Sequence, residues 1–137
     1  MRSDEFELYE MANIDRHDHY IDSAVKFHIM QPGKWMLDGR GPRLKLYKGG
    51  WKQSNSKKTI TGVKIGYTAN NVEILYDGLH IKGNEKKEII KHIIKYRLAY
   101  ILMWLDAGMT RSELVNQFEL IDTNRSSEVL KEIQWLL

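Results

Sequence analysis

The feature that most constrains the fold is a change of hydrophobic period within residues 59–105. In the first part of this range apolar and polar side chains alternate, as at Val63 and Ile65. A period of two is typical of a β-strand with one buried face. In the later part apolar residues recur every three or four positions, as at Ile90 and Ile94, which is typical of an amphipathic helix. Strands followed by helices predict an α+β fold in which helices pack on an antiparallel sheet.

Residues 59–82 predict a three-stranded antiparallel meander. "KTITGVKIGYT" and "NNVEILY" are its first two strands. The Asp77-Gly78 pair that follows is typical of a type I′ hairpin turn, so "LHIKG" is expected to return as the third strand, with His80 on its polar side. Upstream segments at 24–30 and 43–47 have the composition of further strands. The whole antiparallel meander is therefore expected to have about three to five strands.

Three helices are predicted after the sheet. The first spans about 84–106, with Asn84 as its N-cap, an apolar side toward the sheet, and His92 exposed beside a row of lysines. Gly108 is expected just beyond its end. "TRSE" at 110–113 is a capping box that begins the second helix.

The third helix is expected over "RSSEVLKEIQWLL", the last residues of the sequence. Its predicted inward side chains are Val129, Leu130, Ile133, Leu136 and Leu137. With the two helices before it, it forms the helical part that packs against the sheet.

The 27-residue stretch "AGMTRSELVNQFELIDTNRSSEVLKEI" resembles the helix-turn-helix of DNA-binding proteins. The matching positions are "AG-T--EL---F" in the first helix and "NRSSEVLKEI" in the second. The turn is expected to be longer than the three or four residues of that motif. The second helix also carries Glu128 and Glu132 beside Lys131, and acidic residues repel a phosphate backbone. Compact helical packing is therefore the favoured interpretation.

Length and composition limit the remaining possibilities. The 137 residues are enough for one domain, so we expect a single α+β domain over 1–137, with a β-rich part at about 24–82 and a helical part at about 84–137. The sequence has no cysteine, which excludes disulfides, thiol catalysis and cysteine-bound zinc. No signal peptide is recognised at the N-terminus. The apolar stretch 89–105 is too short and too charged to span a membrane. A cytoplasmic protein with no membrane partner is expected.

The net charge of +3 hides an uneven distribution. Residues 1–25 hold two basic and seven acidic side chains, whereas residues 26–97 hold sixteen basic and five acidic ones. Residues 98–137 are again acidic, with three basic and six acidic side chains. A basic middle between acidic ends favours an anion-binding surface or internal charge pairing.

The segment 34–64 carries this basic charge, with Asp38 as its single acid. Trp35, Tyr47 and Trp51 are interleaved with the cations. Cations supply salt-dependent contacts to phosphates, and aromatic rings supply stacking surfaces for unpaired bases. The predicted DNA- or RNA-binding residues are Arg40, Arg43, Lys45, Lys48, Trp51, Lys52, Lys57 and Lys58.

His17 and His19, within "DRHDHYID", are the candidates for a metal site. They converge only in an extended segment, since alternate strand residues share a face. In a helix they diverge by about 160°. Spacing does not decide whether His28, His80 or His92 would complete the site. We therefore predict no metal, no cofactor and no catalytic residue.

Three hypotheses about function follow. The leading one is a non-enzymatic, nucleic-acid-associated accessory or regulatory protein that uses a basic, aromatic-bearing β-surface. The alternative is a small regulator or inhibitor that acts by binding another protein, since tyrosine, tryptophan and arginine suit interfaces. The third is a metal-dependent hydrolase or nuclease through His17 and His19. Enzyme loop motifs for phosphate binding or a serine nucleophile are absent from the sequence, which favours the first two.

Overall fold

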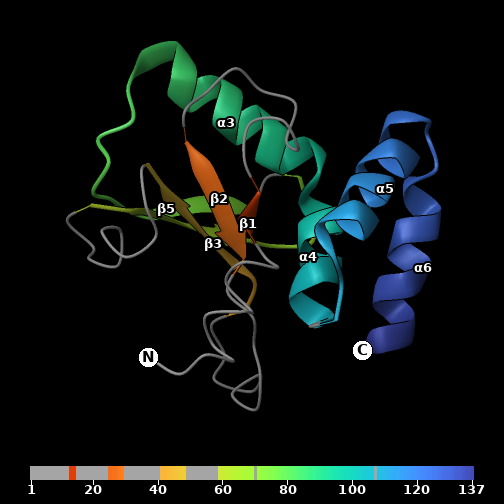
Figure 1. The fold of residues 1–137 in the computed structure, drawn as a ribbon. Coiled ribbons are helices and arrows are strands. Elements are labelled where there is room, and N and C mark those ends of the chain that lie inside the picture. The colour runs from red at the N-terminus through yellow and green to blue at the C-terminus, as the bar shows by residue number, and fades with distance from the viewer. Residues whose placement is uncertain (1–12, 15–24, 30–40, 49–58, 70, 107) are drawn as a thin grey trace.

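A computed structural model describes residues 13–14, 25–29, 41–48, 59–69, 71–106 and 108–137 (Figure 1). In these ranges five strands form one sheet, and four helices follow them in the chain. The predicted α+β fold, an antiparallel meander followed by helices packed against it, is confirmed.

The sheet is antiparallel throughout, and its strands lie side by side in chain order. They are β1 (Asn13–Ile14), β2 (Lys26–Ile29), β3 (Arg43–Tyr47), β4 (Thr61–Ile65) and β5 (Val72–Asp77). The upstream strands and the first two strands of the predicted meander are therefore present. A register shift between Gly62 and Val63 interrupts the pairing of β4 with β5.

One side of the sheet, which we call the inner face, packs against the helices. Phe27, Leu46 and Thr61 are cross-strand neighbours on this side, because paired residues of adjacent strands point the same way. The Phe27 ring centroid lies 5.4 Å from that of His92 in the first helix. Other fully buried residues of the inner face are Leu44, Val63 and Ile65. We call the opposite side the outer face.

The helices are α3 (Gly83–Lys95), α4 (Arg97–Leu105), α5 (Arg111–Asp122) and α6 (Ser126–Leu136). The single helix predicted for 84–106 is divided at Tyr96, whose φ of −104° and ψ of 18° lie outside helical values. The Arg97 guanidinium donates a 2.8 Å hydrogen bond to the Ile94 carbonyl oxygen. In an unbroken helix that oxygen would accept the amide four residues later, so the arginine satisfies a group that the break leaves free.

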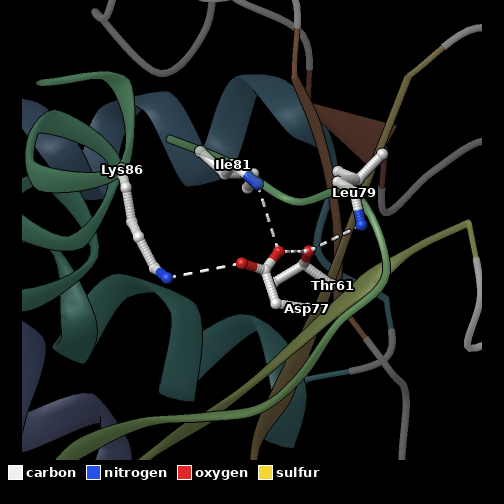
Figure 2. A network of polar contacts seen from close by, with 5 residues as sticks. All are labelled: Thr61, Asp77, Leu79, Ile81 and Lys86. Carbon is white, nitrogen blue, oxygen red and sulfur yellow. Dashed lines mark hydrogen bonds and ion pairs between the residues drawn. The ribbon is translucent and has the colours of Figure 1, made fainter. Parts of the chain in front are cut away.

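The predicted return strand "LHIKG" is wrong. After β5 the chain makes a turn in which His80 has a φ of 53°, and α3 then begins at Gly83. Figure 2 shows why: the amides that a return strand would pair with β5 are bound by side chains. The Leu79 amide donates to Thr61 Oγ1 at 3.4 Å, and the Ile81 amide donates to Asp77 Oδ1 at 3.3 Å.

The Asp77 carboxylate holds this turn through two further contacts (Figure 2). It accepts a 2.6 Å hydrogen bond from the Thr61 hydroxyl, and it pairs with the Lys86 ammonium of α3 at 3.3 Å. The N-cap of α3 is Lys82, with no side-chain capping bond, so the prediction that Asn84 is the cap is also wrong. Asp77 connects the last strand to the first helix in place of a local cap.

His92 is buried, not exposed as predicted. Its side chain is 5% exposed and lies among the rings of Phe27, Tyr96, Tyr100 and Phe118. The predicted apolar stripe did not include it, because a histidine next to lysines in the sequence has the composition of a solvated face.

The second predicted helix, α5, starts where the sequence predicts, but only some of the residues predicted to point inward from α6 are buried. Thr110 and Glu113 form the expected capping box of α5. Val129 and Ile133 of α6 are fully buried against the other helices. Three further leucines predicted to point inward are exposed instead, because only one stripe of α6 meets its neighbours: Leu130, Leu136 and Leu137.

The turn between α5 and α6 has three residues, 123–125, so the expectation of a longer turn is wrong. Asn124 has a φ of 60°, and its amide donates to the Ile121 carbonyl at 3.1 Å. The Arg125 amide donates to the Leu120 carbonyl at 2.7 Å. These two bonds are the Schellman pattern that ends a helix, with asparagine in the place that glycine usually takes.

None of the helices in the described ranges is long and apolar enough to cross a membrane.

Candidate nucleic-acid interface

Three of the predicted nucleic-acid-binding residues, Arg43, Lys45 and Lys48, lie in the described part of the chain. The remaining five lie outside it: Arg40, Trp51, Lys52, Lys57 and Lys58. His17 and His19, the candidate metal ligands, also lie outside the described residues. The geometry of the candidate interface is therefore that of β3 and its neighbours.

Arg43 and Lys45 point to the outer face of the sheet. They alternate along β3 with Leu44 and Leu46, which lie on the inner face. Both cations are partly buried. The sheet thus carries two neighbouring positive side chains on the side away from α3 and α4.

Burial and mutual repulsion both act on the Lys45 ammonium. Burial, and next the positive charge of Arg43, lowers the pKa of the Lys45 ammonium. The Nε atom of Arg43 is buried, and no hydrogen-bond acceptor in the described part of the chain reaches it. A buried donor without a partner is rare in folded proteins, and a phosphate oxygen is a natural acceptor for a guanidinium.

Lys64 of β4 joins the pair. It lies directly across from Arg43 in the register of β3 with β4, and Glu73 of β5 lies across from Lys64 on the other side. Lys64 was not among the predicted site residues. Its alternation with Val63 and Ile65 already placed it on the polar side of its strand, but the register that brings it to Arg43 crosses the loop between β3 and β4, and no local pattern fixes it.

Lys48 does not join this cluster in the structure. It follows the end of β3, and its ammonium lies 3.8 Å from a carboxylate oxygen of Glu85 in α3. The Lys48 side chain is 47% exposed and the Glu85 side chain is 33% exposed, so solvent screens the pair and it contributes little to stability. The structure places Lys48 beside the helix that covers the inner face.

Two tyrosines share the outer face with the cations. Tyr47 lies across from Lys26, two residues along β3 from Lys45, and is 2% exposed. Tyr76 lies across from Gly62, which in turn lies across from Lys45. Tyr76 is partly exposed. Tyr47 is one of the three aromatic residues that the sequence interleaves with the cations, whereas Tyr76 was not among them.

The outer face is not uniformly open. His28 of β2 lies in the same cross-strand row as Lys45 and is 1% exposed, like the buried Tyr47. Exposure rises toward β4 and β5, where Lys64 and Tyr76 are partly exposed and Glu73 is exposed. The candidate interface therefore lies over β3, β4 and β5. We call it the outer cluster and define it by Arg43, Lys45, Lys64 and Tyr76.

A second polar cluster, made of Lys95, Tyr96 and Asp122, joins the helices and is structural. The Tyr96 hydroxyl donates to Asp122 at 2.6 Å, and the Lys95 ammonium pairs with the same carboxylate at 3.0 Å. Burial, and next the Asp122 carboxylate, raises the pKa of Tyr96. Burial also opposes ionisation of Asp122, but the bonds from Tyr96 and Lys95 outweigh it and lower the pKa of that carboxyl. These contacts connect the break between α3 and α4 to the end of α5.

In the part of the chain that the structure describes, no three histidine, aspartate or glutamate side chains gather as they would around a metal ion. The metal hypothesis based on His17 and His19 stays a prediction, since both residues fall outside that part. Comparisons with protein-family models, curated proteins and solved structures found no match to this chain.

Proposed function

We propose that the protein is a non-enzymatic nucleic-acid-binding accessory or regulatory protein and that the outer cluster contacts the phosphates. The observation that carries this proposal is that Arg43 and Lys45 lie next to each other on the outer face of β3. Burial and the neighbouring guanidinium lower the pKa of Lys45, and the buried Nε of Arg43 has no acceptor among the described residues. A bound phosphate supplies an acceptor for that Nε.

Lys64 extends the positive surface by one strand, because it lies across from Arg43. Three cations on adjacent strands match a phosphate backbone better than a single small anion, since the backbone presents charges in series. The basic residues that lie outside the described ranges remain candidates for the same surface on the sequence argument alone.

A binding titration at two salt concentrations tests the proposal. Affinity of the wild-type chain for a nucleic acid should fall steeply between about 50 mM and about 200 mM salt, since bound cations release counterions. The double variant Arg43→Gln, Lys45→Gln should bind more weakly. Its slope of log affinity against log salt should be smaller by about 1.4–1.8, since each phosphate contact contributes about 0.7–0.9.

The matched control removes two positive charges elsewhere. Lys87 and Lys91 are exposed on α3, away from the outer face. The double variant Lys87→Gln, Lys91→Gln should retain most of the affinity and the salt slope. Equal losses in the two double variants would assign the binding to net charge alone, and absence of salt-dependent binding to DNA and to RNA would refute the proposal.

One observation favours the alternative, a regulator that binds another protein. The end of α6 exposes several apolar side chains, among them Trp135 at 86% and Leu137 at 74%. Exposed tryptophan is typical of interface hot spots. A stoichiometric protein partner that survives nuclease treatment, is lost in Trp135→Ala and is kept in Lys45→Gln would favour this alternative over nucleic acid.

A further inference from the structure

A cross-strand row on the outer face brings Lys45, Gly62 and Tyr76 together. Lys45 pairs with Gly62, and Gly62 pairs with Tyr76. The register shift between Gly62 and Val63 is the irregularity that sets this alignment. It leaves Leu75 as an extra residue on β5, next to Tyr76, and Leu75 is exposed. A β-bulge of this kind redirects side chains at functional surfaces.

Gly62 makes room for the ring of Tyr76. A Cβ atom added at Gly62 would lie 2.5 Å from the Cζ atom of Tyr76, 2.6 Å from Cε1 and 2.8 Å from the hydroxyl oxygen. The phenol ring therefore fills the space that a side chain at position 62 would occupy and lies against the sheet. An aromatic ring held in this way has few conformations left to lose when a second ring stacks on it.

Cations lie on the two strands beside Tyr76, β4 and β3. Neighbouring strands lie about 4.8 Å apart and successive residues rise about 3.3 Å. On this grid the backbones of Lys45 and Lys64 lie within about 10 Å of that of Tyr76, and Arg43 is across from Lys64. The surface thus places a partly exposed aromatic ring on the same face as three cations, of which Lys45 and Lys64 are nearer to it than Arg43. That combination is suited to a nucleic acid whose bases are unstacked and whose phosphates run alongside.

We propose that the outer cluster binds single-stranded nucleic acid in preference to duplex, with an unpaired base stacked on Tyr76 and the adjoining phosphates held by Arg43, Lys45 and Lys64. This inference rests on the proposed function and adds the class of nucleic acid to it. In a duplex the base faces are covered by neighbouring base pairs, so a duplex engages the cations but not the ring. DNA and RNA both present base faces, so the inference applies to either.

The test compares single strands of DNA and RNA with a duplex of the same sequence, at the same two salt concentrations, for the wild type and three variants. Tyr76→Leu removes the ring and should weaken single-strand binding about tenfold, in keeping with the loss of one stacked base. Its duplex binding and its salt slope should not change, because no phosphate contact is lost. Tyr76→Phe keeps the ring and should bind as the wild type does. Tyr67→Leu is the matched control, because Tyr67 is exposed beyond the end of β4, and it should bind single strands normally.

Failure of this inference is distinguishable from failure of the proposed function. Equal affinity for single strand and duplex, with Tyr76→Leu binding like the wild type, overturns the stacking role. The proposed function then stands if Arg43→Gln, Lys45→Gln still loses salt-dependent affinity. If that double variant binds normally, both the stacking inference and the proposed function are refuted.

A crosslinking measurement on the wild-type chain tests the same placement without any substitution. A single strand that contains iodouracil is irradiated in complex with the protein, and the adduct is mapped by peptide. An adduct on the peptide that contains Tyr76 supports the inference. Adducts confined to other peptides overturn it.

Discussion

The Nε2 atom of His92 in α3 lies 2.7 Å from the Tyr100 hydroxyl oxygen in α4, and both side chains are buried. This contact crosses the break at Tyr96 and joins the two helices inside the core. Phe27 of β2 stacks near Tyr100 with ring centroids 6.1 Å apart, so the same contact lies against the inner face of the sheet. A buried hydrogen bond between two polar aromatic side chains fixes how these helices meet.

Removing the Tyr100 hydroxyl should destabilise the protein. Tyr100→Phe leaves the ring packing intact but deprives a buried imidazole nitrogen of this partner, at an expected cost of about 1–3 kcal/mol. Urea denaturation followed by circular dichroism measures the change in unfolding free energy. Tyr67→Phe, an exposed position, should change it by less than about 0.5 kcal/mol. Equal values for the two variants would show that the contact is not structural.

The turn after β5 should make stability depend on pH in the acid range. Burial opposes ionisation of Asp77, but the hydrogen bonds from Thr61, the Ile81 amide and Lys86 outweigh it and lower the pKa of that carboxyl below 3.8. A carboxyl whose pKa is depressed on folding stabilises the folded state above its unfolded pKa of about 4, and this contribution is lost as the pH falls through the folded pKa.

The measurement compares the wild type with Asp77→Asn in urea at about pH 6 and about pH 3, on either side of the reference carboxyl pKa. The variant should be less stable by about 1–3 kcal/mol at the higher pH, since hydrogen bonds to a charged group are lost. The difference should shrink at the lower pH. Glu88→Gln, on the exposed side of α3, should change little at either pH. A difference for Asp77→Asn that stays constant with pH would contradict the role given to its ionised form.

The two contacts to Asp122 should contribute unequally. The Tyr96 hydroxyl is part of a buried residue and donates to the carboxylate at 2.6 Å, so Tyr96→Phe should cost about 1–2 kcal/mol. The Lys95 ammonium is mostly exposed, so Lys95→Gln should cost less than about 1 kcal/mol. Thermal unfolding of both variants checks the order. The reverse order would mean that the exposed ion pair, and not the buried hydroxyl, holds α5 to the helix break.

A side chain at position 62 should displace Tyr76. Gly62→Val places carbon atoms where the phenol ring lies, and overpacking of this kind costs about 1–3 kcal/mol. Adding Tyr76→Ala to that variant should recover part of the loss, because the two residues are in contact and their effects are not additive. A double-mutant cycle by urea denaturation measures the coupling. Additive losses would show that the ring does not occupy the space above Gly62.

Local patterns in the sequence determined most of the elements, including four strands of the sheet and the starts of the later helices. Alternation at Val63 and Ile65 indicated a strand with one buried face, and the capping box at Thr110 located the start of α5. Both signals act within a few residues, through backbone geometry and short-range hydrogen bonds. For that reason the α+β fold and the strand at 43–47, which carries Arg43 and Lys45, were predicted from the residues alone.

Tertiary contacts decided what those patterns left open. The return strand after Asp77 failed because Thr61, sixteen residues earlier, and Lys86 in α3 bind the same carboxylate. His92 is buried because aromatic rings from a strand and two other helices enclose it. Lys64 reaches Arg43, and Tyr76 reaches Gly62, only through strand register. The partners in each case are distant in sequence, and the free energy of such contacts depends on geometry that only the folded chain supplies.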